Sequence, residues 1–245
     1  MRLGMMQPYF FPYLGYFGLI HATDEWIVFD TPQYIRRGWV NRNRILSDGK
    51  TPWKYIRVPI AACDRDTAIR DVRIHPDRSW KRDLLNSLEV YRLLRAPFYA
   101  ATISMLETAL RYRHEHLSEL LVHCLETCCQ HIGLPLRCRR FSELQLSLPR
   151  IGTPGEWALE TARALGAHTY INPPGGRTLF NPSAFHSARI SLRFLTPQLP
   201  EYYQGGLPFQ PGLSIIDALM WNDVSTVRHM IAQYVLESDA VSQAA

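Results

Sequence analysis

Hydrophobic and polar residues follow one another along this chain with periods that predict strands and helices in turn. The apolar run RLGMM (2–6) and the β-forming run EWIVFD (25–30) predict strands, and LGYFGLIHA (14–22) between them carries apolar residues at helical spacing. The opening therefore has the size of one strand-helix-strand unit. Further strands are expected from alternating or β-rich segments at 53–60, 69–76, 168–172 and 190–195.

Longer segments with helical spacing of apolar residues predict the helices. One begins at Ser79, a favourable N-cap, and runs to about residue 94. Two more occupy most of 104–132 and end at Gly133, a favourable C-cap. Another covers 156–167, and 213–236 predicts a terminal helical section.

Strands that alternate with helices predict an α/β fold. We expect a Rossmann-like, mostly parallel sheet flanked by helices, with a helical segment around residues 79–133. The chain is expected to form one domain over residues 1–237, followed by a frayed tail over 238–245. In such a fold, ligands bind at the loops that follow the strands.

Composition narrows the class of protein. Of the 245 residues, 47% are hydrophobic and 20% are charged, which is typical of a globular protein and not of a disordered one. Prolines and glycines interrupt the apolar opening, so neither a membrane-spanning helix nor a secretory signal is expected, and we expect a cytoplasmic protein without membrane insertion. The net charge of +5 suits a polyanion such as tRNA or a nucleotide, but it equally serves solubility.

The segment QPYFFPYLGYF (7–17) holds six aromatic residues without any single period. Pro8 and Pro12 restrict its backbone, and aromatic rings in such a loop form a rigid wall with polar tips at Tyr9, Tyr13 and Tyr16. The segment therefore walls a ligand site or plugs the core beneath the sheet. Its place between a strand and a helix is also that of the HxGH motif in nucleotidyltransferases, with YLGY (13–16) in the place of HxGH. Because tyrosine is not cationic near neutral pH, that mechanism is disfavoured.

A second cluster, QYIRRGWVNRNRI (33–45), mixes guanidinium and amide groups. Such groups bind phosphate or carboxylate bidentately and donate to sugar hydroxyls, although a solvated basic loop has the same composition. Asp30, just upstream at a strand end, is a candidate base or a salt-bridge partner for one of these arginines. The candidate ligand-binding residues of the cluster are Gln33, Arg37, Asn41, Arg42 and Asn43.

Two later segments carry polar residues among apolar ones. INPPGGRTLF (171–180) leaves a predicted strand, and its Gly175 and Gly176 bring backbone N–H groups close to an anion or simply form a turn. The segment 202–222 contains Gln204, Ser214, Asp217 and Asn222.

Metal and thiol chemistry are not indicated. The five cysteines are odd in number, and Cys124, Cys128 and Cys129 lie on a predicted helix without the knuckle spacing of structural zinc sites. We expect no tightly bound metal, and the sequence identifies no other cofactor.

Taken in order, these segments resemble those of the WbqC-like family. The matching motifs are QPYFFPYLGYF (7–17), QYIRRGWVNRNRI (33–45), WKYIRVP (53–59), YINPPGG (170–176) and FQPGLSIIDALMWN (209–222). Members of this family are associated with O-antigen and related surface-polysaccharide pathways and are often described as glycine transferases. The polar positions within or beside these motifs are Gln7, Tyr9, Tyr16, Asp30, Gln33, Arg37, Asn41, Arg42, Asn43, Asn172, Gln204, Ser214, Asp217 and Asn222. Thr31 departs from the acidic residue that is common there, which places more weight on Asp30.

The resemblance implies an aminoacyl transferase, with glycine as the expected amino acid, that forms an amide on an amine of a nucleotide-linked sugar or similar metabolite. The activated donor would be an aminoacyl-tRNA or a carrier protein. Asp30 or Asp217 would accept the proton, Arg37 and Arg42 would bind phosphate or the oxyanion, and Asn41 and Asn43 would orient the acceptor. Two alternatives stay open: a nucleotidyltransferase-like enzyme or ligase using ATP or CTP, and a non-catalytic sugar- or nucleotide-binding component of a biosynthetic complex.

Overall fold

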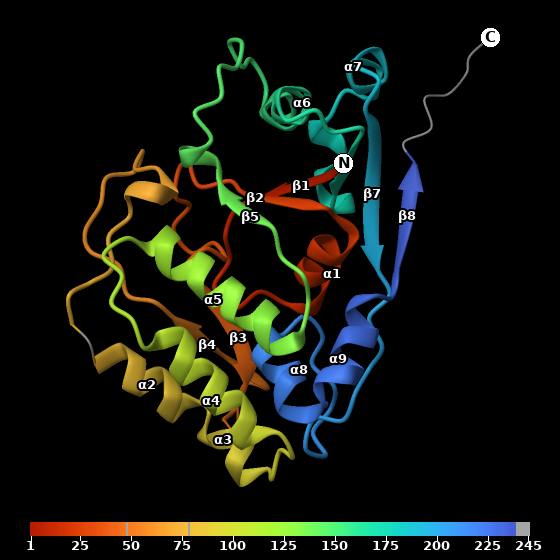
Figure 1. Ribbon diagram of the computed structural model, residues 1–245. Helices are drawn as coiled ribbons and strands as arrows, with labels where there is room; N and C mark the ends of the chain where they lie inside the picture. Colours follow the sequence, from red (N-terminus) through yellow and green to blue (C-terminus); the bar gives the residue numbers. More distant parts are fainter. Residues whose placement is uncertain (48, 78, 239–245) are drawn as a thin grey trace.

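The computed structural model describes residues 1–47, 49–77 and 79–238 (Figure 1). Its strands are β1 (Arg2–Met6), β2 (Glu25–Val28), β3 (Arg42–Leu46), β4 (Trp53–Arg57), β5 (Cys138–Arg140), β6 (Thr169–Asn172), β7 (Ser191–Pro197) and β8 (Tyr234–Ser238). Its α-helices are α1 (Leu14–Ala22), α2 (Ser79–Ser87), α3 (Glu89–Leu93), α4 (Tyr99–Leu110), α5 (Leu117–Ile132), α6 (Pro154–Ala164), α7 (Pro182–Ser187), α8 (Ile215–Trp221) and α9 (Val224–Ile231). The short 3-10 helices are η1 (Ile69–Asp71), η2 (Phe141–Glu143) and η3 (Pro174–Leu179).

Within the described residues, six strands form one sheet in the order β5-β2-β1-β6-β7-β8. All neighbouring pairs are parallel except β7 and β8, which are antiparallel. The expected α/β fold with a mostly parallel sheet flanked by helices is confirmed. The chain builds the sheet from β1 to β2 and β5 on one side and then crosses to β6 on the other. The strand order therefore reverses between β1 and β6.

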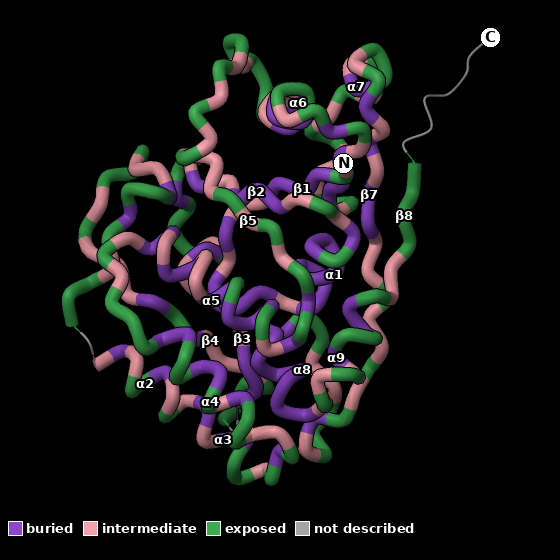
Figure 2. Tube along the Cα trace, in the orientation of Figure 1, coloured by how far each residue is buried: buried purple, intermediate pink, exposed green. Residues whose placement is uncertain are grey.

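The two faces of the sheet are covered by different helices. Leu3 and Met5 of β1, together with Ile27 of β2, pack against α6 and α7. Trp26 and Val28 of β2 instead join the larger core formed with α1, α5 and α8. This alternation is the two-residue period of a strand buried on both faces, and Figure 2 shows β1 and β2 as a nearly continuous buried stretch. On the Trp26 side of β1 only glycine fits at position 4, because an added Cβ would lie 2.7 Å from the Trp26 ring.

A separate antiparallel hairpin, β3–β4, lies beside α8 and α2. It holds the aromatic segment 7–17, which we call the aromatic loop. The Asn43 amide donates to the backbone oxygens of Phe10 (3.1 Å) and Phe11 (2.8 Å), and the Ser214 hydroxyl donates to Phe11 O (2.7 Å). The backbone of the aromatic loop is thus fixed between the hairpin and the start of α8.

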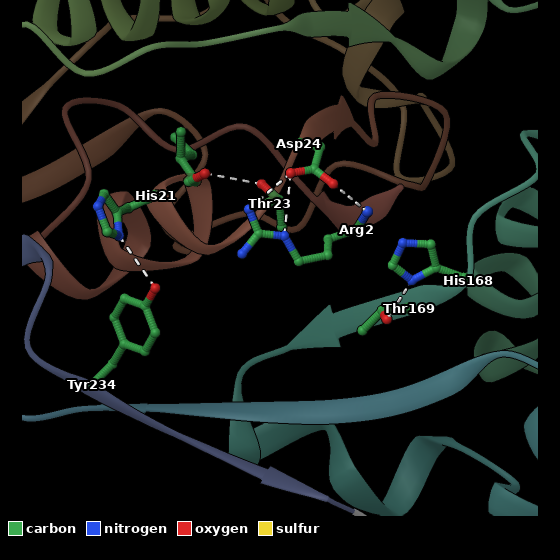
Figure 3. A network of polar contacts seen from close by, with 8 residues as sticks. Arg2, His21, Thr23, Asp24, His168, Thr169 and Tyr234 are labelled. Carbon is green, nitrogen blue, oxygen red and sulfur yellow. Dashed lines mark hydrogen bonds and ion pairs between the residues drawn. The ribbon is translucent and has the colours of Figure 1, made fainter.

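The amino ends of the strands carry their own polar contacts (Figure 3). The Arg2 guanidinium donates to Asp24 Oδ1 at 2.8 Å, and the Arg2 backbone N–H donates to Asp24 Oδ2 at 2.7 Å. These hydrogen bonds lower the pKa of Asp24. His21 at the end of α1 contacts the Tyr234 hydroxyl on β8 at 3.2 Å. The first contact holds the turn after α1 against the start of β1, and the second joins the end of α1 to β8.

Several expected elements differ from the structure. Residues 69–76 are not a strand: η1 is followed by the isolated bridges Arg73–His116 and Ile60–Ile74. The helix expected over 79–94 is divided into α2 and α3 at Leu88, which is fully buried. The two helices expected within 104–132 are both present, but the first, α4, begins earlier, at Tyr99, and ends at Leu110.

Two further differences affect the predicted clusters. Part of the basic segment expected to be a loop is a strand, β3, whose alternate side chains reach the core through Asn43 and Ile45. The terminal section is helical only as far as Ile231, because the chain then adds β8 antiparallel to β7. Of the tail expected over 238–245, Ser238 ends β8 and the rest lies outside the described residues.

Replacing Asn43 with alanine should destabilise the protein. The substitution removes the Asn43 donor from the Phe10 and Phe11 oxygens in a buried environment, so we expect a loss of about 1–3 kcal/mol in the free energy of unfolding. Urea denaturation followed by circular dichroism measures it. Asn86→Ala on the exposed face of α2 is the control and should be near neutral. Equal midpoints for the two variants would contradict the role assigned to Asn43.

Candidate functional site

A cavity of about 680 Å³ lies where β1, β2 and β6 end, and we call it the sheet-edge cavity. It is lined by Met5, Met6, Gln7, Tyr9, Phe29, Thr31, Pro32, Ile151, Gly152, Thr153, Pro154, Trp157, Ala158, Tyr170, Asn172, Leu179 and Phe180. Its walls therefore come from the carboxyl ends of three neighbouring parallel strands, from the start of α6 and from η3. This is the crevice beside the reversal of strand order, where open α/β sheets bind ligands.

The sheet-edge cavity is uncharged, because none of its described lining residues carries an ionised side chain. The positive end of α6 is already occupied by a residue of that helix: Glu156 accepts from the Gly152 N–H (2.6 Å) and from the Thr153 hydroxyl (3.1 Å). The Gly152 hydrogen bond lowers the pKa of Glu156. The helix end is thus compensated by its own carboxylate and does not call for an anionic ligand.

Three polar groups of the sheet-edge cavity have no hydrogen-bond partner among the described residues. They are the Gln7 side-chain amide, the Tyr9 hydroxyl and the Thr31 hydroxyl. Thr31 Oγ1 is also fully buried. Since an unpaired buried hydroxyl costs free energy, this part of the wall is suited to a ligand that forms hydrogen bonds.

A second cavity, of about 350 Å³, faces α1 and the hairpin, and we call it the hairpin cavity. It is lined by Met6, Tyr9, Tyr13, Tyr16, Leu19, Trp39, Asn43, Arg44, Pro173 and Gly212. Met6 and Tyr9 line both cavities. The two cavities therefore meet at the point where the aromatic loop leaves β1.

The tyrosines of the hairpin cavity are neutral hydrogen-bonding groups. Burial raises the pKa of Tyr9, Tyr13 and Tyr16. The Tyr16 hydroxyl donates to Gln7 O at 3.0 Å, so it holds the loop. The hydroxyls of Tyr9 and Tyr13 have no partner among the described residues. Of the two tyrosines at the HxGH positions, only Tyr13 thus has a hydroxyl that is unpaired within the described part of the chain.

Comparison with known proteins now adds to this geometry. The model of the WbqC-like protein family matches residues 7–229, which include all the lining residues of both cavities except Met5 and Met6. The chain belongs to the WbqC-like protein family. It is 26% identical over 220 residues to the uncharacterized protein Rv1507c of Mycobacterium tuberculosis, an alignment that covers 89% of this chain and 92% of the relative. No solved structure is significantly similar to it.

The described part of this WbqC-like chain contains no helix that is both long enough and apolar enough to cross a membrane.

The loops expected to form a site do converge in this WbqC-like fold. Gln7 and Tyr9 from one loop and Asn172 from the other line the sheet-edge cavity. Tyr16 and Asn43 line the hairpin cavity together with Tyr9. Gly175 and Gly176 lie in η3, and Gly176 approaches Asn172 so closely that an added Cβ would be 2.4 Å from its Nδ2.

Most polar side chains of the cluster at residues 33–45 form hydrogen bonds with the chain's own backbone. Gln33 donates to Arg65 O (2.7 Å), and Asn41 bridges the Tyr34 hydroxyl and Val58 O. The Arg42 guanidinium donates to the oxygens of Gly38 and Arg37 and lies over the Tyr55 ring. Gln33, Arg37, Asn41 and Arg42 line neither cavity.

Asp30 is fully buried and does not line either cavity, although Phe29 and Thr31 on both sides of it do. Its carboxylate accepts from the Ser142 N–H (3.0 Å) and from the Ser142 hydroxyl (2.7 Å). Asp30 therefore joins the end of β2 to η2, and the free hydroxyl beside it belongs to Thr31.

Asp217 is the centre of a buried hydrogen-bond network away from both cavities. The Tyr91 hydroxyl donates to its Oδ1 (2.8 Å), and the Tyr202 hydroxyl (2.6 Å) and the Gln204 amide (2.7 Å) donate to its Oδ2. Ser214 is the N-cap of α8, and Asn222 follows its last turn and donates to Ala218 O. Asp217 and Gln204 thus fix α8 to α3 and to the preceding loop, whereas Ser214 and Asn222 pair with backbone groups at the two ends of α8.

Sequence reasoning gave no ligand-binding role to Thr31 or to the start of α6. Arg44 belongs to the predicted guanidinium and amide cluster of residues 33–45, but it is not among the candidate residues selected from that cluster. Thr31 follows directly on a predicted strand, which is the signal that would have found it. The start of α6 carried the sequence Gly152-Thr153-Pro154 ahead of a predicted helix. Its approach to β1 is a tertiary contact without a local signature.

The cysteines of α5 are unreactive in this setting. Cys124, Cys128 and Cys129 are buried, and burial raises the pKa of each thiol. No group of three or more potential metal-ligating side chains occurs within residues 1–47, 49–77 and 79–238.

The Asp217 network should give the protein a characteristic pH dependence. Burial raises the pKa of Asp217 from 3.8 to about 6, against the effect of its hydrogen bonds. Between pH 3.8 and about pH 6 the Asp217 carboxyl of the folded chain keeps a proton that the unfolded chain has released. The contribution of Asp217 to the free energy of unfolding therefore falls as pH rises through this interval and is constant above it. The stability difference between wild type and Asp217→Asn should fall by about 2 kcal/mol from pH 4 to pH 6.

Chemical denaturation at several pH values measures this difference. The matched control is Asp223→Asn: Asp223 caps α9, and the Thr226 N–H lowers its pKa, so its contribution is complete above the ordinary pKa of an aspartate. The difference between wild type and this control should stay constant over the same interval. A constant difference for Asp217→Asn as well would refute a raised pKa.

Proposed function

We propose that this protein is an aminoacyl transferase, with glycine the expected amino acid, that forms an amide on an amine of a sugar-containing acceptor. The observation that carries the proposal is the pair of cavities that share Met6 and Tyr9. A transfer between two small molecules needs two sites that meet at the reacting atoms, because proximity supplies much of the rate. Family membership is consistent with this reaction class.

The sheet-edge cavity is suited to the acceptor. A sugar ring presents apolar C–H faces and many uncharged hydroxyls. The cavity offers aromatic rings at Phe29, Trp157 and Phe180, and its free polar groups are amides and hydroxyls rather than charges. A volume of about 680 Å³ lies within the range of small-molecule sites. An acceptor whose reacting amine is carried by a sugar ring fits these properties.

The reaction joins the acyl carbon of the donor to the acceptor nitrogen. The bond that breaks is the ester or thioester bond of the activated donor, and the proton of the nitrogen leaves with the departing oxygen or sulfur. No described lining residue is a carboxylate or a histidine, so the amine reacts in its neutral form and the site contributes positioning. Tyr9 stands at the junction, and its raised pKa keeps the hydroxyl protonated to donate to the developing oxyanion.

The test combines the protein with a nucleotide-linked amino sugar and either glycyl-tRNA or a glycyl thioester of a carrier protein. Mass spectrometry should show the acceptor heavier by one glycyl residue. Tyr9→Phe should lower kcat about 100-fold, because one oxyanion donor is lost. Tyr112→Phe removes a hydroxyl from an exposed side chain outside both cavities and should leave kcat unchanged.

The other functions give different results in the same experiment. Affinity for the amino-sugar nucleotide without any product from either donor would overturn the proposal and favour a binding component. Release of pyrophosphate from ATP or CTP would instead indicate nucleotidyl transfer. A Tyr9→Phe rate equal to wild type would remove Tyr9 from the reaction.

A further inference from the structure

The Arg44 side chain lies between two tryptophans at the wall of the hairpin cavity. Its guanidinium carbon is 5.5 Å from the centre of the Trp39 ring and 5.2 Å from that of Trp53. Its backbone is fixed as well, because Arg44 N–H donates to Asn43 Oδ1 (2.8 Å) and Arg44 O accepts from Ser214 N–H (2.9 Å). Such stacking orders the guanidinium before any ligand arrives.

The hydrogen bonds of this guanidinium are largely unused. Its only hydrogen bond within the described part of the chain runs from Nη2 to Gly212 O at 3.2 Å, and its Nε is buried without a partner. No carboxylate of a described residue lies within ion-pair distance of it. By contrast, Arg42 on the same strand donates from Nε and Nη2 to the oxygens of Gly38 and Arg37. A partly buried cation with most of its donors free calls for an anionic partner.

The immediate surroundings leave room for that partner. The hairpin cavity measures about 350 Å³, and the unpaired Tyr13 hydroxyl lies on its wall with Arg44. Gly212 also lines it, and an added Cβ there would stand 3.4 Å from Arg44 Nη2. The backbone φ of +66° favours glycine at position 212, and a side chain there would be in contact with the guanidinium.

We infer that the hairpin cavity is an oxyanion site in which Arg44 binds a carboxylate or phosphate group, with Tyr13 donating a further hydrogen bond. The anion site stands on the contacts of Arg44 alone. Its assignment to the charged part of the acyl donor rests on the proposed function. The two cavities then differ in kind: the one beside α6 takes an uncharged ring and the one beside the hairpin takes an anion.

Tryptophan fluorescence reports on this site directly, since Trp39 and Trp53 flank Arg44. Separate titrations with inorganic phosphate and with acetate at constant ionic strength distinguish the two oxyanions. We expect a saturable fluorescence change with at least one of them, and calorimetry should give the same Kd. Arg44→Gln should weaken that binding by about 10-fold or more, because it removes a charge-assisted hydrogen bond.

Arg57→Gln is the matched control. It removes the same charge from the other strand of the hairpin, where the side chain is exposed and lines neither cavity, and its Kd should equal that of wild type. Arg44→Lys keeps the charge without the planar fork and should give an intermediate Kd, which also serves if Arg44→Gln does not fold.

Two results would overturn the site: wild-type affinity in both Arg44 variants, or no saturable binding of either anion. Anion binding that depends on Arg44 in a protein without transfer activity would leave this site in place and refute only the proposed function. Transfer activity without any anion binding would refute the anion site and leave the proposed function in place.

Discussion

The structure depends on how the backbone oxygens of the aromatic loop are paired. Phe10 and Phe11 are fully buried, so their backbone carbonyl oxygens cannot accept hydrogen bonds from water. Each oxygen therefore needs a hydrogen-bond donor from the protein. Asn43 supplies donors to both, and Ser214 supplies a second one to Phe11 O. Pro12 O is likewise paired with the Ile215 N–H. Three segments far apart in the sequence are thereby locked together.

This pairing also determines where the cavities lie. Fixing the backbone at Phe10 and Phe11 leaves Tyr9 and Tyr13, on either side, facing open space. Because Asn43 is held by the loop, its neighbour Arg44 is brought to the same place. The same contacts with the aromatic loop therefore fix Asn43 in the core and place Arg44 at the hairpin cavity. A change in the aromatic loop would alter both cavities at the wall that they share.

The sequence predicted the fold better than it predicted the roles of polar residues. The periods of the segments at β1, α1, β2 and α6 identify these elements because the spacing of apolar residues that each element needs is present within the segment itself. β8 follows a helical period and becomes a strand only because β7 offers it an edge, which is a contact no local pattern records.

For the site, the two loops after β1 and β6 were predicted from the rule for parallel sheets, and they do line one cavity. Asp217, Asn41 and Arg42 were selected because they are polar within recognisable motifs. Their partners, Tyr91, Val58 O and Gly38 O, show that these side chains serve the backbone and the core. A single sequence cannot separate the two uses, since both require a hydrogen-bonding side chain in an apolar setting.

The position of β1 in the middle of the sheet has a consequence for synthesis on the ribosome. β1 is made first and soon finds β2, but its other neighbour, β6, does not exist until residues 169–172 have been added. Through that interval the strand keeps an unpaired edge, which is a template for pairing with other chains. Gly212 completes the walls later still. A nascent chain therefore gains both complete sites only after Gly212 has been added, and release before that point would yield an aggregation-prone fragment rather than a partly active one.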